Sequence, residues 1–174
     1  MTPDQATVIL NMTALPALKA EHPVTQRVIA AIPAGKADYR PDDVVKTALE
    51  LAWHIVTAEN RFMEAVINGA FDLTPRERPA TVRTPDDVNR WYADQFAKNV
   101  DRLARVPADQ LVKSVDFRGL FQFPAVMYAQ LGLSHSVHHR GQLSMYLRPM
   151  GAKVPSIYGE SYDARVAREA AQMK

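Results

Sequence analysis

The sequence contains no cysteine. This absence excludes disulfide bonds, thiolate ligands for a metal ion and a cysteine nucleophile. Any metal ion must therefore be held by histidine, aspartate or glutamate side chains. An enzyme that uses thiol chemistry would have to take its thiol from a second substrate.

Long apolar runs and an excess of one charge are also missing. No stretch approaches the roughly 18 uninterrupted apolar residues of a membrane span. The first five residues, Met1–Gln5, lack the basic and apolar regions of a signal peptide. The 21 lysines and arginines nearly balance the 19 aspartates and glutamates and are scattered along the chain. We therefore expect a cytoplasmic protein that binds neither membranes nor nucleic acid.

The composition is that of an ordinary folded protein. Hydrophobic residues make up 47% of the 174 residues and charged residues 23%. This length supports one domain with its own core, so we expect residues 1–174 to form a single unit. Glycine is scarce, with seven residues, and alternation of apolar and polar residues is rare, which favours helices throughout.

Apolar periodicity predicts two helices in the first half of the chain. The first covers Pro3–Ile32, with an interruption near His22-Pro23, because proline clashes with a helix already under way. The second begins with the acidic turn Arg40–Asp43 and ends near Asn68-Gly69, where glycine suits a C-terminal cap. Apolar residues recur at three- and four-residue intervals from Val44 to Val66, and His54 lies on that buried face.

Two further long helices are predicted in the second half. Thr84-Pro85 reads as an N-cap followed by proline at the first helical position, and that helix stops at Pro107. The last long helix runs from Pro124 to Leu147 and is apolar on more than one side, as expected in the middle of a bundle. A hairpin about Arg118-Gly119 and a short helix over Asp163–Ala171 complete the prediction. The fold class is therefore all-α, a four-helix bundle with one or two crossing connections.

Three of the five histidines fall within a single five-residue stretch, 135–139, of the last long helix. His135 and His139 are one turn apart and about 40° apart around the helix, a spacing that offers two imidazoles to one metal ion. His138, beside the pair, either replaces one of them or makes a supporting hydrogen bond. His54 on the second helix supplies a third imidazole if the two helices are neighbours. His22, at the expected helix boundary, is interpreted as a surface or capping residue.

The segment Ser134–Gln142 resembles the HxxxHRGQ signature of the DinB-like (DinB/YfiT) superfamily of predicted metalloenzymes. Tyr39-Arg40-Pro41, the stretch from Leu51 to Glu59, and Pro155–Gly159 resemble other parts of the family pattern. The resemblance spans roughly Glu21 to Tyr158, and Met1–Ala20 has no assigned counterpart.

This resemblance implies a four-helix bundle with up-down-down-up connectivity, commonly a homodimer. It also implies a zinc or nickel ion held by His54, His135 and His139, with His138 as a non-ligand. Glu59 is carried over from the family pattern as a residue that orients a ligand imidazole or a bound water. Gln142, one turn beyond His139, is a candidate for the same role; the alternative for both residues is that they are exposed polar residues at helix ends. Arg140 either steadies an anionic substrate or pairs with a carboxylate.

Family members of known activity imply a metal-dependent S-transferase or isomerase that uses a low-molecular-weight thiol as co-substrate. The absence of cysteine is compatible with this activity, because the thiol comes from outside the chain. Two alternatives stay open. A metal-dependent hydrolase would use the same site with water as the nucleophile. A non-catalytic bundle, working as a dimer or as a binding module, would use a metal ion only for structure or hold none.

Overall fold

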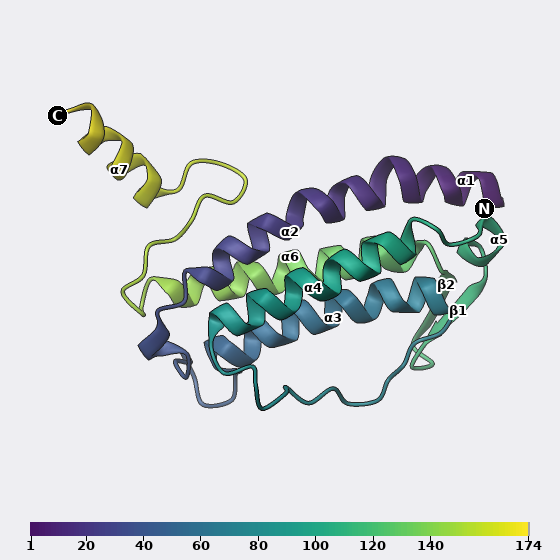
Figure 1. Cartoon of the computed structure of the whole chain (residues 1–174), viewed down its shortest axis with the longest axis horizontal. Coiled ribbons are helices and arrows are strands. Elements are labelled where there is room, and N and C mark those ends of the chain that lie inside the picture. The colour runs from purple at the N-terminus through teal and green to yellow at the C-terminus, as the bar shows by residue number, and fades with distance from the viewer. Residues whose placement is uncertain (174) are drawn as a thin grey trace.

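The computed structural model describes residues 1–173, which are mostly helical and include one small two-stranded sheet (Figure 1). The elements in chain order are α1 (Pro3–Ile9), the π-helical turn η1 (Leu10–Ala14), α2 (Leu15–Ala30), the 3-10 turn η2 (Ala34–Lys36), α3 (Ala48–Asn68), α4 (Pro85–Leu103), α5 (Ala108–Leu111), β1 (Ser114–Phe117), β2 (Phe121–Pro124), α6 (Met127–Leu147) and α7 (Tyr162–Gln172). The helical fold class is therefore confirmed.

The N-terminal helix is continuous where the sequence predicted a break. The expected interruption near His22-Pro23 is wrong, because α2 passes through Pro23 without ending. Val28 and Ile29, one turn later, are fully buried, and their packing holds the helix together. The irregular turn is η1, which comes directly before Pro16. A wider turn at that point accommodates a proline ring that crowds the carbonyl four residues earlier.

The start of α3 also differs from the prediction. Residues 40–46 form turns rather than a first helical turn, and Val44 is 92% exposed. The helix begins after Thr47, whose hydroxyl accepts the backbone N–H of Glu50, while the Glu50 carboxylate accepts the Thr47 N–H at 2.8 Å. The helix therefore begins at this capping box and not at the proline and aspartates upstream. Gly69, with φ of 73°, provides the predicted C-terminal cap.

Local signals in the second half of the chain are confirmed. The Thr84 hydroxyl caps α4 through the Asp87 N–H, and Pro85 occupies the first turn. The hairpin of β1 and β2 pairs Phe117 with Phe121. Its loop has three residues, 118–120, and Arg118 and Gly119 within it have positive φ values of 58° and 68°. The C-terminal helix α7 begins one residue before the predicted start and ends one residue after the predicted end.

The long helices α2, α3, α4 and α6 lie side by side in the body of the molecule (Figure 1). α3 packs against both α4 and α6, and α2 packs against the same two helices. The contact between α3 and α6 is close because a Cβ atom added to Gly132 would lie 2.5 Å from the Phe62 Cβ. Only glycine permits this approach, and it brings His54 beside the histidines of α6.

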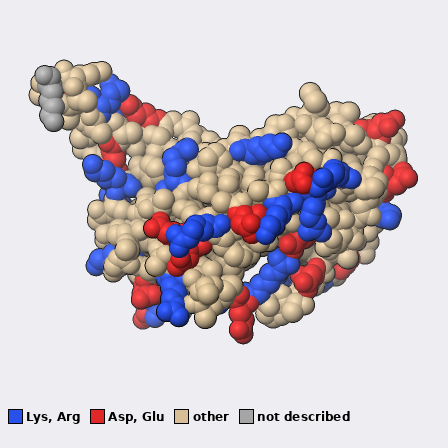
Figure 2. All heavy atoms as spheres, viewed as in Figure 1, with Lys and Arg blue, Asp and Glu red and all other residues tan. Residues whose placement is uncertain are grey.

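Lysines and arginines are interspersed with aspartates and glutamates on the face that Figure 2 shows. None of the helices in residues 1–173 combines the length and the apolar character that crossing a lipid bilayer would demand. The terminal helix α7 extends away from the bundle (Figure 1).

Candidate metal centre

The structure brings together the three histidines that the sequence singled out. His54 comes from the first half of α3, and His135 and His139 come from successive turns of α6. One ring nitrogen from each histidine lies within 4.8 Å of the other two. His54 Nε2 and His139 Nε2 are 3.3 Å apart. His54 and His139 are 85 residues apart in the chain, so the packing of α3 on α6 creates the cluster.

The geometry of the cluster fits one divalent ion. Two nitrogens bound at 2.0–2.1 Å to a tetrahedral zinc ion lie about 3.3–3.4 Å apart, and the two Nε2 atoms already have this separation. His135 Nδ1 is buried and has no hydrogen-bond partner among residues 1–173. A buried imidazole nitrogen without a partner carries a desolvation cost that a bound ion or water can remove.

The protonation states of the three rings also suit metal binding. Burial, followed by the neighbouring imidazoles, lowers the pKa of His54 and of His135 to about 4. Burial likewise lowers the pKa of His139. Histidines with pKa values below the ordinary 6.5 are neutral near pH 7, so their lone pairs are free to bind a cation.

Gln142 fixes the orientation of His139. The distance from His139 Nδ1 to Gln142 Oε1 is 2.6 Å, and Gln142 Nε2 lies 3.2 Å from His138 Nε2. The amide oxygen can only accept, so Nδ1 of His139 donates and its lone pair is on Nε2, which faces His54. His138 is exposed and is not one of the three clustered histidines, but its ring lies 4.9 Å from that of His139 and its Nε2 lies near Gln142.

Glu59 and Arg140 lie in the bundle core. Glu59 is 2% exposed and accepts a hydrogen bond of 2.5 Å from the Tyr92 hydroxyl, and burial raises the pKa of its carboxyl group. Arg140 is 1% exposed and forms an ion pair of 2.6 Å with Glu21. It also donates to the Tyr158 hydroxyl at 2.7 Å. Of the two roles predicted for Arg140, these contacts match the pairing with a carboxylate.

His22 is the histidine that sequence reasoning misplaced. It was expected at the surface or in a cap, but its ring stacks on Phe96 at 3.9 Å and lies 4.4 Å from the Tyr92 ring. Its Nε2 is buried without a partner among the described residues, and burial lowers its pKa to about 4. The neighbouring Pro23 had suggested a helix boundary, and only the packing of α2 on α4 shows that this position faces the core.

Three hollows surround the histidine cluster. His54 lines a cleft of about 650 Å³ that contains several arginines. His54 and His135 both line a hollow of about 260 Å³ with Phe62, Phe71 and Phe117. His139 and Gln142 line a third hollow of about 490 Å³. A small molecule therefore has room to reach each imidazole.

The sequence model of the DinB family matches residues 11–170 of this chain. The chain belongs to the DinB family. The match confirms the resemblance seen in the histidine signature, and it begins within the segment Met1–Ala20, for which the sequence suggested no counterpart.

Known proteins of DinB type agree with this assignment. The uncharacterized protein YjoA of Bacillus subtilis (strain 168) is 28% identical over 130 residues, which are 74% of this chain and 82% of YjoA. The crystal structure of that DinB-like protein superposes with a TM-score of 0.68 at 24% identity, covering 83% of this chain and 96% of the other. The crystal structure of a DinB-like protein from Bacillus cereus ATCC 10987 superposes with a TM-score of 0.69 at 22% sequence identity. The match covers 83% of this chain and 95% of the other. These structures share the fold of this chain.

Proposed function

We propose that this protein is a metal-dependent enzyme that holds one zinc or nickel ion through His54, His135 and His139. The observation that carries the proposal is the convergence of three ring nitrogens within 4.8 Å, from two helices of a DinB-family chain. Three protein ligands leave coordination positions for a substrate, whereas structural zinc sites usually have four. An ion held by three neutral imidazoles keeps its full charge and lowers the pKa of a thiol or water that binds to it.

The residues of this chain would position the reactants. Gln142 holds the His139 ring with Nε2 toward His54, so the ligand set is preorganised before anything binds. The hollow lined by His54 and His135 is bounded by aromatic rings, which would offer an apolar surface to a ligand beside the centre. We propose that the partner is a small-molecule thiol and that the reaction is S-transfer or isomerisation. The chain has no cysteine, so the thiol would come from the co-substrate.

We also propose the up-down-down-up connectivity of the long helices and a homodimeric assembly. The connection of residues 69–84 runs back along the bundle in Figure 1, which supports the up-down-down-up order of α2, α3, α4 and α6. We propose a homodimer, supported by α7, where Tyr162 and Val166 are 62% and 43% exposed one turn apart on a helix that extends from the bundle. Sedimentation equilibrium tests this assembly, and a monomer mass at micromolar concentration would contradict it.

A thiol-consumption assay tests the proposed activity. Zinc- or nickel-loaded protein is incubated with monochlorobimane and a panel of cellular low-molecular-weight thiols, with metal-stripped protein as the control. We expect at least one thiol to be consumed at least about tenfold faster with the loaded protein, because a lower thiol pKa raises the thiolate fraction. Equal rates with and without metal would contradict thiol transfer. The hydrolase and the non-catalytic bundle would then be the remaining candidates.

A further inference from the structure

The cleft beside His54 is rich in cationic side chains. Five basic residues and two acidic residues line it, together with His54 itself. The basic residues are Arg40, Lys46, Arg61, Arg76 and Arg78. A cleft of this kind attracts an anionic group, provided that at least one of the cations is not already neutralised by the protein.

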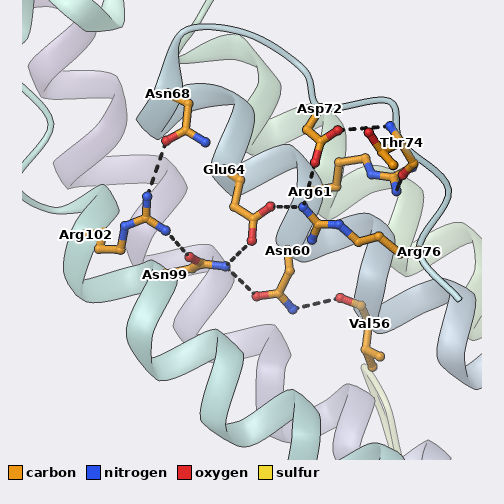
Figure 3. Close-up of polar contacts among 10 residues, drawn as sticks. All are labelled: Val56, Asn60, Arg61, Glu64, Asn68, Asp72, Thr74, Arg76, Asn99 and Arg102. Atoms are coloured by element: carbon orange, nitrogen blue, oxygen red, sulfur yellow. Dashed lines mark hydrogen bonds and ion pairs between the residues drawn. The ribbon is translucent and has the colours of Figure 1, made fainter. Parts of the chain in front are cut away.

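Most of the arginines in this cleft already have partners. Arg76 pairs with Glu64 and lies 3.8 Å from Asp72, which ties the loop after α3 to that helix (Figure 3). Arg40 pairs with Asp43 at 3.2 Å. Arg78 donates to the backbone carbonyl of Val82. These three guanidinium groups therefore stabilise the walls of the cleft.

Arg61, like Lys46 and Arg78, has no carboxylate partner among residues 1–173, but of these three cations it alone lines the aromatic hollow as well as the cleft. No aspartate or glutamate oxygen within residues 1–173 lies within 4.0 Å of its guanidinium group, and its Nε is buried without a hydrogen bond. Its Nη2 donates to the Thr74 carbonyl at 2.8 Å, which fixes the side chain (Figure 3). Burial, and next the charge of Arg76, lower the pKa of Arg61 from its ordinary value. The site therefore holds a cation that is fixed in place and forms no ion pair with a carboxylate among residues 1–173.

Arg61 also lies at a useful distance from the metal centre. It is seven residues after His54 on α3, so both side chains are on one face, about 10 Å apart along the helix axis. Arg61 lines both the cationic cleft and the aromatic hollow that His54 and His135 share. One elongated molecule can therefore contact Arg61 at one end and the histidines at the other.

We propose that Arg61 anchors the carboxylate of an elongated anionic thiol, whose sulfur reaches the centre formed by His54, His135 and His139. A planar guanidinium matches a carboxylate, because it can donate two parallel hydrogen bonds to the two carboxylate oxygens. The apolar part of the ligand would lie against Phe62, Phe71 and Phe117. This inference rests on the proposed function, because it assumes that the histidine centre receives the thiol.

Isothermal titration calorimetry with three matched probes tests the anchor. The probes are 6-mercaptohexanoate, 6-mercaptohexanol and hexanoate, each titrated into zinc-loaded protein, with hexanoate also titrated into metal-free protein. We expect the mercaptocarboxylate to bind about tenfold more tightly than the mercaptoalcohol, because a hydrogen bond to a charged group contributes about 1.5 kcal/mol or more. In Arg61→Gln this preference should disappear, and in Arg61→Lys it should shrink.

Arg78→Gln is the matched control. It removes one positive charge from the same cleft and leaves Arg61 unchanged, so we expect it to alter the preference by no more than about threefold. Circular dichroism checks that each variant is folded. If Arg61→Gln retains the tenfold preference, or if Arg78→Gln loses it to the same extent, the anchor is contradicted.

The probes separate this inference from the proposed function. Equal binding of the two thiols leaves a thiol site standing and overturns the role of Arg61. Equal, Arg61-dependent binding of hexanoate and 6-mercaptohexanoate supports the anchor and counts against thiol use. Failure of all three probes to bind at millimolar concentration overturns the anchor.

Discussion

His54→Ala is expected to abolish metal binding. Wild-type protein purified without an affinity tag should contain close to one equivalent of zinc or nickel, and the variant should contain less than about a tenth of an equivalent. Removing His54 leaves only the two imidazoles of α6, and it takes away the Nε2 that lies 3.3 Å from His139 Nε2. Two neutral ligands from one helix do not retain a divalent ion through purification and dialysis.

His138→Ala serves as the control for this loss of metal. His138 is exposed, stands next to His139 in the sequence and lies outside the cluster of three nitrogens. We expect this variant to keep its equivalent of metal, as measured by inductively coupled plasma mass spectrometry. Wild-type protein with less than about half an equivalent, unchanged in His54→Ala, would contradict the assignment of these ligands.

Arg140→Met is expected to lower the free energy of unfolding by about 3 kcal/mol. Arg140 is 1% exposed, and its removal leaves the Glu21 carboxylate without its cation. Breaking a buried ion pair by removing one partner costs about 3–5 kcal/mol. Glu21 is 19% exposed, so water compensates part of the loss and the lower end of this range applies. Urea denaturation measures the change.

An exposed arginine provides the comparison. Arg105 pairs with Asp101 on the surface of the bundle, where both side chains are about two-thirds exposed, so Arg105→Met should cost less than about 1 kcal/mol. The double variant Glu21→Gln with Arg140→Met should be more stable than the sum of the single changes predicts, because the stranded charge is gone. Equal costs for Arg140→Met and Arg105→Met would show that the core ion pair does not stabilise this fold.

Local features of the fold were predictable from the sequence because a few adjacent residues determine them. Thr84-Pro85 marks the start of α4, Gly69 caps α3, and Arg118-Gly119 turns the hairpin. The start of α3 was predicted wrongly because two signals compete within eight residues. The proline and aspartates before Val44 resemble a first turn, but the box formed by Thr47 and Glu50 sets the boundary.

Long-range features were not predictable from periodicity. The adjacency of α3 and α6 depends on Gly132 admitting Phe62, a fit between side chains that sequence patterns do not reveal. Arg140 forms an ion pair with Glu21, 119 positions earlier in the chain, and this partner neutralises its charge in the core. The spacing of His135 and His139 indicated two ligands, and the buried face of the second helix offered His54 as a third. Only the family resemblance indicated that these two helices are neighbours.

X-ray absorption at the metal edge of wild-type protein tests the central claim most directly. We expect a first shell with three imidazole nitrogens at about 2.0–2.1 Å, from His54, His135 and His139, completed by light atoms from solvent or substrate. In His54→Ala loaded with excess metal, the imidazole contribution should fall to two. A wild-type spectrum with fewer than two imidazoles, or one that His54→Ala leaves unchanged, would contradict the proposed centre.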